Sequence, residues 1–206
     1  MIYLEFKDAL KAFPVFSVHE IEKQFAGFDN RRLVEWQEKG YIQKLRNRYY
    51  RFTDHPVDES YLFYCANAIY GPSYVSLESA LSNYGFIPEG VFQITSCSTL
   101  KTNTFETPVG NFSYRNLKPE LFFGYQLQRM NNHHYTIATP EKAIIDYLYL
   151  NNKIESPAEF ESLRWNASEI STRISMEKLD AYINHIGSMA LTSRMNHLRN
   201  YLNANT

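Results

Sequence analysis

Basic side chains gather between Lys23 and Arg51. This stretch contains eight Lys or Arg residues and three Asp or Glu residues, whereas the full chain of 206 residues carries a formal net charge of −1. Guanidinium and ammonium groups bind phosphate oxygens, and a local excess of them is typical of surfaces that contact nucleic acids. A solvated helix face can carry the same charge, so the order of the surrounding elements has to separate the two interpretations.

Two short helices are predicted around this stretch. Ser17 and Glu20 have the spacing of a capping box, in which the hydroxyl and the carboxylate each accept a hydrogen bond from a backbone N–H at a helix start. We expect a helix over about residues 18–25, after which Gly27 supplies the backbone freedom for a sharp turn. An earlier helix near the start of the chain would complete a small core.

The second helix is predicted to follow Asp29, which can cap it, and to stop at Gly40. Its apolar positions are expected to pack inward, and they are Leu33, Val34 and Trp36. Its polar positions are expected to face solvent, and they are Asn30, Arg31, Arg32, Glu35, Glu38 and Lys39. This pattern is typical of an amphipathic recognition helix.

Residues 41–52, YIQKLRNRYYRF, predict a two-stranded hairpin with a turn at Asn47, a residue that accepts the left-handed conformation. The basic residues on or beside this hairpin are Lys44, Arg46, Arg48 and Arg51. Two helices joined by a sharp turn and followed by a basic hairpin are the outline of a winged helix-turn-helix, so DNA binding is the leading interpretation. One alternative is a winged helix that docks a protein. RNA binding is a second alternative and is less favoured, because no usual RNA-binding signature is visible.

Length and charge distribution predict two domains. The winged helix-turn-helix would occupy residues 1–55, with the boundary near Asp54 to Val57. Residues 56–206 would form a second domain of ordinary size. This part has 11 Lys or Arg residues against 14 Asp or Glu residues, so it is a poor candidate for a broad phosphate-binding surface.

The second domain has both helical and strand patterns, which makes the whole chain α+β. Helices are expected at residues 59–70 and 77–84, and Thr139-Pro140 supplies a cap and a first-position proline for a helix that ends near Leu150. Five strands between residues 91 and 139 are expected to form an antiparallel sheet flanked by these helices. A helical tail would begin at about residue 152, with helices near 157–164, 176–186 and 189–203.

Cys65 and Cys97 offer neither a disulfide framework nor a CxxC zinc site, so both are expected to be reduced core residues. His133 and His134 would point to opposite faces of a strand and lack further metal ligands, so no metal site is predicted. Neither a signal peptide nor a run of about 18 apolar residues is visible. The sequence therefore predicts no membrane association and a cytoplasmic location.

The common nucleotide and catalytic motifs are not present in this sequence. No two glycines have the spacing of GxGxxG, and Val91-Phe92 follow Gly90 where a phosphate-binding loop needs Lys and Ser or Thr. The nuclease-like pattern Glu5-Phe6-Lys7 has no upstream acid, and no GxSxG elbow occurs. We therefore expect a protein that is not an enzyme, with no catalytic residues and no cofactor.

Four segments beyond the hairpin form a specific combination. They are YVSLESALSNYGFIPE (74–89), FETPVGNFSYR (105–115), LFFGY (121–125) and ATPEKAIIDYLYL (138–150). In this order and behind a winged helix, they resemble the AbiEi family, the antitoxins of type IV toxin–antitoxin and abortive-infection systems. The resemblance covers about residues 15–150, and the tail after Asn151 has no counterpart in it.

The resemblance implies a protein with two activities. Its winged helix would bind inverted repeats in its own promoter and repress transcription, either as a homodimer or as cooperatively bound monomers. Its second domain would antagonise a nucleotidyltransferase-like toxin without forming a stable complex with it. Carried over to this chain, the groove-contacting positions are Asn30, Arg31, Arg32 and Glu35, and the backbone-contacting positions are Lys44, Arg46, Arg48 and Arg51.

The shared motifs of the second domain also have structural explanations, namely helix capping, a hairpin turn and core packing. The polar residues that need no such role are Glu78, Glu106, Arg115, Glu141, Lys142 and Asp146. A cluster of these residues could form a functional surface. The apolar faces of the last two tail helices can pack within the chain or form a dimer surface.

Overall fold

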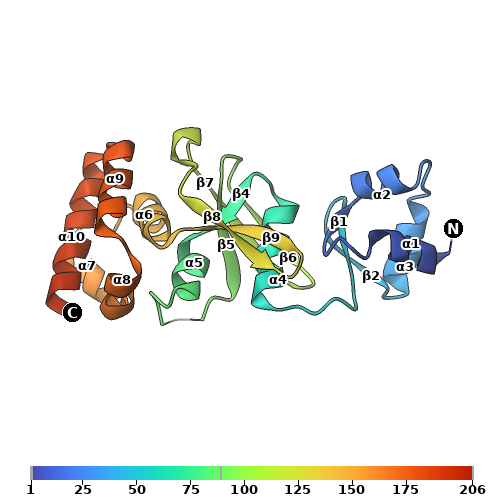
Figure 1. Ribbon diagram of the computed structural model, residues 1–206, viewed down its shortest axis with the longest axis horizontal. Helices are drawn as coiled ribbons and strands as arrows, with labels where there is room; N and C mark the ends of the chain where they lie inside the picture. The colour runs from blue at the N-terminus through green and yellow to red at the C-terminus, as the bar shows by residue number, and fades with distance from the viewer. Residues whose placement is uncertain (1, 89, 206) are drawn as a thin grey trace.

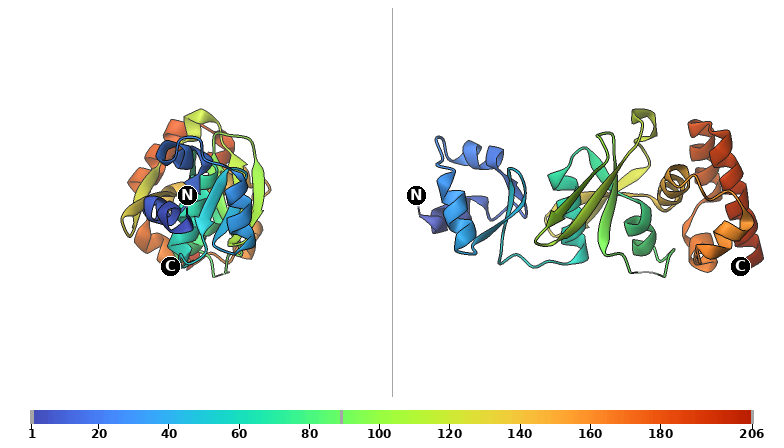
Figure 2. Two further views of the ribbon diagram at one scale, coloured as in Figure 1. Left: turned by 90° about the vertical axis from the view of Figure 1, so that its right-hand side faces the viewer. Right: turned by 180° about the vertical axis from the view of Figure 1, so that it is seen from behind.

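The computed structural model of the protein describes residues 2–88 and 90–205. The chain is an α+β protein whose parts follow one another along an elongated molecule (Figure 1). Residues 3–52, here called the N-terminal unit, lie at one end, a larger central sheet lies in the middle, and a group of helices lies at the other end. The view from behind shows the same arrangement (Figure 2).

The N-terminal unit packs helices against a small antiparallel sheet with the strand order β1-β3-β2. Its elements are α1 (Tyr3–Leu10), β1 (Phe16–Ser17), α2 (Val18–Gln24), α3 (Arg31–Glu38), β2 (Ile42–Arg46) and β3 (Tyr49–Phe52). The core is aromatic: the rings of Phe6 on α1 and Trp36 on α3 lie 4.5 Å apart, and the ring of Phe52 lies 6.0 Å from that of Phe6. These contacts hold α1 and α3 on the sheet.

Local signals at the helix ends of this unit are confirmed. Ser17 and Glu20 form the predicted capping box at the start of α2. Gly27 and Gly40 have φ angles of +72° and +69°, at the turn after α2 and directly after α3. Only glycine adopts this left-handed region without steric cost, so the chain reverses where the sequence predicts it.

Some local predictions need correction. Asn30 occupies the cap position of α3, although Asp29 accepts a hydrogen bond from the backbone N–H two residues later at 3.0 Å. Val34 does not pack inward. It is 56% exposed, whereas Leu33 and Trp36 form the buried face of the short α3. The left-handed residue of the β2–β3 turn is Arg48, with a φ of +71°, rather than Asn47.

Within the described residues, the central sheet has six strands in the order β6-β7-β5-β4-β9-β8. They are β4 (Ser73–Val75), β5 (Gln93–Ser98), β6 (Asn103–Thr107), β7 (Gly110–Asn116), β8 (Tyr125–Met130) and β9 (His133–Ala138). The predicted strands are present, but the sheet is mixed, because β5 pairs with β7 and β4 pairs with β9 in parallel. Strand β6 folds back on the far side of β7, which returns β7 to the direction of β5.

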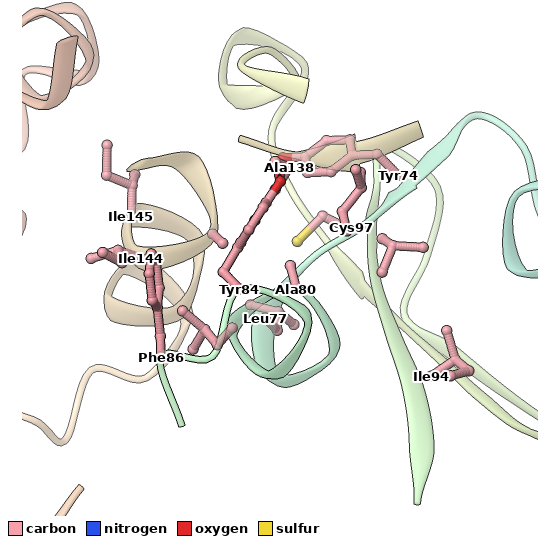
Figure 3. Packing of buried hydrophobic residues seen from close by; sticks show 14 of the residues in the cluster. Tyr74, Leu77, Ala80, Tyr84, Phe86, Ile94, Cys97, Ala138, Ile144 and Ile145 are labelled. Carbon is pink, nitrogen blue, oxygen red and sulfur yellow. The ribbon is translucent and has the colours of Figure 1, made fainter. Parts of the chain in front are cut away.

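Strand β4 is not predicted by the sequence, because three residues between two helices are too few to show an alternating pattern. The helices around the sheet match the prediction. They are α4 (Glu59–Ile69), α5 (Leu77–Asn83) and α6 (Pro140–Leu150), with a short 3-10 turn η1 (Pro119–Leu121) before β8. The Tyr84 hydroxyl after α5 donates a hydrogen bond to the Ala138 carbonyl at 2.7 Å, and Phe86 lies against Ile144 of α6 (Figure 3).

A buried ion pair joins α6 to β4. Lys142 and Asp146, one helical turn apart on α6, are both buried and paired. The Asp146 carboxylate accepts hydrogen bonds from the hydroxyls of Tyr74 and Ser76, each at 2.8 Å, and the Lys142 ammonium donates to the Tyr74 hydroxyl at 2.9 Å. These two charged residues are therefore part of the interior and not of an exposed functional surface.

The helical end contains α7 (Pro157–Ser162), α8 (Ala167–Arg173), α9 (Met176–Ile186) and α10 (Met189–Asn205). The sequence does not predict α8, a short helix that Asn166 caps. The tail packs within the chain, since its main apolar side chains are buried against the central core, namely Leu179, Ile183, Leu191, Met195, Leu198 and Leu202. Glu141 of α6 fixes α9 by accepting from the Ser175 N–H at 3.0 Å and pairing with Lys178 at 2.8 Å.

Both cysteines are unpaired and buried, as predicted. Burial raises the pKa of the Cys65 thiol to about 12, so this residue remains protonated at neutral pH. Among the described residues, no helix has the length and apolar character needed to cross a membrane. No group of three or more His, Cys, Asp or Glu side chains within those residues is placed to hold a metal ion.

We predict that Asp146→Ala destabilises the protein by about 3–5 kcal/mol, because it leaves the Lys142 ammonium buried without its counter-ion. The double variant Lys142→Met, Asp146→Leu should recover most of this loss, since it removes both charges. Urea unfolding followed by circular dichroism measures both values. A loss below about 1 kcal/mol for the single variant would show that the pair is not needed in the interior.

Candidate nucleic-acid interface

The exposed sides of α2, α3 and the β2–β3 turn meet at a shallow groove on the N-terminal unit. The groove has a volume of about 270 Å³ and is lined by Val18, Glu22, Asn30, Leu33, Val34, Asn47, Arg48 and Tyr50. Its position follows from the packing of α2 against the hairpin: the N–H of Val18 donates a hydrogen bond to the carbonyl of Arg48 at 2.9 Å. The turn of the hairpin is thereby held beside the two helices.

The basic residues at the start of α3 are placed on the surface, as predicted. The side chain of Arg31 is 91% exposed and pairs with Asp29 at 2.9 Å. Hydrogen bonds from Arg31 hold the pKa of the Asp29 carboxyl below its ordinary value. Arg32 is half-buried beside it. Exposed ion pairs contribute little to stability, so a phosphate can replace Asp29 as the partner of Arg31 at small cost.

Glu35 also lies on the exposed side of α3, one turn beyond Arg31. It pairs with Lys39 at 2.6 Å, and the hydrogen bond from Lys39 lowers the pKa of its carboxyl. Asn30 is exposed at the N-terminal end of the same helix. The first turns of α3 therefore present an amide, guanidinium groups and a carboxylate, which are groups that hydrogen-bond to base edges or phosphates.

On the hairpin, Lys44 and Arg48 are exposed, as predicted. Arg46, in contrast, is half-buried and its guanidinium does not face the open surface of the hairpin. Its guanidinium donates a hydrogen bond to the Ile69 carbonyl at the end of α4 and lies 4.8 Å from the ring centre of Phe105 on β6. The centre of the Tyr70 ring is 5.3 Å from the same guanidinium. Arg46 therefore joins the hairpin to the central sheet, and its assignment as a backbone-contacting residue needs correction.

Arg51 needs the same correction. The residue is 2% exposed, its Nε donates to the Phe52 carbonyl at 3.0 Å, and a second nitrogen donates to the His55 carbonyl. The guanidinium also lies 5.1 Å from the ring centre of Tyr61 on α4. Its donors are directed at the connection between the N-terminal unit and α4, where no phosphate can reach them.

Sequence reasoning missed Val34 as a surface residue. Val34 lies one helical turn after Asn30, and both line the groove. That spacing is the signal that could have identified it, because residues four apart share one face of a helix. An exposed methyl group beside an amide can contact the thymine methyl of an A·T pair while the amide reads the adenine.

The polar residues singled out in the second half of the chain do not form one cluster. Glu141, Lys142 and Asp146 are buried in the contacts described above. Glu106 is exposed on the edge strand β6, whereas Glu78 and Arg115 line a separate cavity.

Comparisons with the models of protein families and with curated proteins found no match for this chain.

We predict that Arg51→Ala lowers the free energy of unfolding by about 2 kcal/mol, because it removes buried hydrogen bonds and a cation–π contact. The matched variant Arg48→Ala should change stability by less than about 0.5 kcal/mol, because the Arg48 side chain is exposed. Urea titrations of the two variants beside the wild type measure the difference. Equal stabilities would contradict the structural role given to Arg51.

Proposed function

We propose that the protein is a DNA-binding transcriptional repressor of its own promoter and the antitoxin of a type IV toxin–antitoxin system, as its resemblance to the AbiEi family implies. In this proposal it acts by binding and has no catalytic step. The observation that carries the DNA-binding part is the groove at which the exposed residues of α3 and the β2–β3 turn meet. We interpret α2 and α3 as the helix-turn-helix and β2–β3 as its wing.

On DNA, α3 would enter the major groove with its N-terminal end first. Asn30 and Val34 would contact base edges, and Arg31 and Arg32 would contact bases or phosphates from the same end of the helix. Lys44 and Arg48 would bind the sugar–phosphate backbone from the hairpin, where they carry no sequence information but fix the orientation of α3. When Arg46 and Arg51 are excluded from the DNA-binding assignment, six basic residues remain between Lys23 and Arg48.

The antitoxin part rests on the four segments that resemble the AbiEi family. In this chain they build β4 and α5, the β6–β7 hairpin, the segment before β8, and α6. They thus contain most of β4, β6 and β7 of the central sheet and both residues of the buried ion pair. Promoter repeats would be read by two copies of the N-terminal unit, supplied by a homodimer or by two cooperatively bound monomers.

One observation favours the alternative that the N-terminal unit docks a protein. Ile2, Leu4 and Tyr41 are exposed apolar residues, and the Tyr41 ring lies 4.4 Å from that of Tyr3 on α1. Scattered exposed apolar residues are common on protein surfaces, so this observation weighs less than the polar groove. The DNA titration below separates the two functions.

We predict that the full-length protein binds a duplex of its own upstream DNA more tightly than a scrambled duplex, with log affinity falling steeply as log salt rises. Fluorescence anisotropy at several salt concentrations measures both effects. Replacing Lys44 and Arg48 by Ala should reduce the salt slope by about two units, because about one counterion is released for each phosphate contact. The variant Lys101→Ala, Lys153→Ala removes the same charge elsewhere and should leave the slope unchanged.

We further predict that Asn30→Ala weakens binding to the native duplex by about 1–3 kcal/mol but leaves binding to the scrambled duplex unchanged, because Asn30 is assigned to base contacts. Replacing Arg31 and Arg32 by Ala should abolish binding to the native duplex. Equal weak binding of the wild-type protein to both duplexes, or no binding, would reject DNA recognition and favour the protein-docking function.

The antitoxin part predicts that the adjacent gene encodes a nucleotidyltransferase-like protein. Expression of that protein alone should arrest growth, and co-expression of this chain should restore it, with no stable complex recovered by size-exclusion chromatography. A chain that binds its promoter but does not relieve the arrest would be a repressor without antitoxin activity.

A further inference from the structure

A cavity of about 620 Å³ lies against the central sheet, separate from the groove of the N-terminal unit. Its walls come from β5, β7, α5, α6, the segment between α5 and β5, and the end of α7 with the segment that follows it. These helices lie on the side of the molecule away from the N-terminal unit (Figure 1). The volume is within the range of sites that bind small molecules, about 300–1,000 Å³.

The floor of the cavity is a polar face of two parallel strands. Gln93 and Thr95 of β5 and Ser113 and Arg115 of β7 line it, and Thr95 lies directly beside Ser113 in the strand register. Alternate residues of a strand point to opposite faces, so the intervening residues of β7, among them Phe112, are buried in the core on the other side. The cavity is therefore not a packing gap between apolar surfaces.

The floor is held rigid against α5. The Thr95 hydroxyl donates to the Ser76 carbonyl at 2.7 Å and accepts from the Ser79 N–H at 3.0 Å. Leu77, which lines the cavity, has a φ of +57°, and Arg164, which lies between two lining residues, has a φ of +51°. Non-glycine residues adopt this conformation at an energetic cost, which the surrounding contacts must offset.

The charges at the cavity are balanced. Among the described residues that line it, Arg115 is the one cation and Glu78 is the one anion. One nitrogen of Arg115 donates a long hydrogen bond of 3.5 Å to the Leu150 carbonyl, which leaves other donors of the guanidinium for a ligand. Glu78 lies in the first turn of α5, and its carboxylate makes no side-chain hydrogen bond or ion pair within the described part of the chain.

The remaining wall is apolar and aromatic. Tyr147 of α6 and Trp165 before α8 line it with ring centres 5.4 Å apart, and Ile87 and Leu163 add aliphatic surface. Phe92 is 98% exposed at the same cavity. An aromatic ring that is fully exposed at a cavity can cover a bound apolar group, and this contact would remove its surface from water.

We propose that this cavity binds a small zwitterion with an apolar side chain, a free α-amino acid. Its carboxylate would pair with Arg115, its ammonium group would pair with Glu78, and its side chain would lie against Tyr147 and Trp165. Charge complementarity selects this class over phosphorylated ligands, because one cation and one carboxylate at the cavity leave no net positive charge for a phosphate dianion. The proposal does not depend on DNA binding.

Tryptophan fluorescence of the full-length protein tests this proposal. Trp165 lines the cavity, whereas Trp36 is buried in the N-terminal unit and serves as an internal reference. L-leucine and L-phenylalanine are expected to change the emission in a saturable way, and Trp165→Phe should abolish the change. Esters and N-acetyl derivatives of the same amino acids, which each lack one charge, should bind roughly tenfold or more weakly.

Glu78→Gln and Arg115→Gln should each weaken binding of the free amino acids by a similar factor, roughly tenfold. Glu106→Gln is the matched control, because Glu106 is exposed on β6 outside the cavity, and it should bind as the wild type does. The esters and N-acetyl derivatives test the same two contacts on the unchanged protein, so a variant that fails to fold does not decide the result.

Several results would overturn the proposal. They are the absence of a response to either amino acid up to the millimolar range, equal binding of the blocked and free amino acids, and a saturable response to adenosine monophosphate but not to amino acids.

Discussion

Lys142 and Asp146 form the contact on which the central part of the molecule depends. Two charges in an interior are costly unless each is paired and hydrogen-bonded, and here the carboxylate also accepts the hydroxyls of Tyr74 and Ser76. Gly124, with a φ of +73°, lies so close that an added Cβ would be 3.0 Å from the Lys142 side chain. The pair therefore brings α6, β4 and the segment before β8 together at one point.

This network matters because β4 is short. It consists of three residues in the middle of the sheet, between an antiparallel and a parallel neighbour, and Val75 is its registered contact with β9. Few backbone hydrogen bonds to the neighbouring strands hold such a short strand in place. The hydrogen bonds from the hydroxyls of Tyr74 and Ser76 to Asp146 therefore help to fix its position. The position of β4 in turn places α5 and, with it, the wall of the cavity.

A second set of contacts ties the N-terminal unit to the rest of the chain. Arg46 and Arg51 carry the charge expected of a phosphate-binding surface, but their guanidinium groups reach carbonyls and aromatic rings of α4 and of the segments that flank it. Lys44 and Arg48, on the same hairpin, remain exposed. One pair of basic residues thus anchors the hairpin to the rest of the chain, whereas the other pair lies on its surface.

The sequence alone determined the elements whose signals are local. The Ser17–Glu20 capping box, the glycine turn at Gly27 and the Thr139 cap of α6 each depend on residues within one helical turn, so neighbours in the sequence suffice to specify them. The tertiary structure decided the rest. The direction of Arg46 depends on the Ile69 carbonyl 23 positions away, and the parallel strand pairs depend on the path of the chain between them. Charge and periodicity do not encode which distant group a long side chain will meet, so Arg46 and Arg51 were assigned to the surface, and Lys142 and Asp146 appeared available for function.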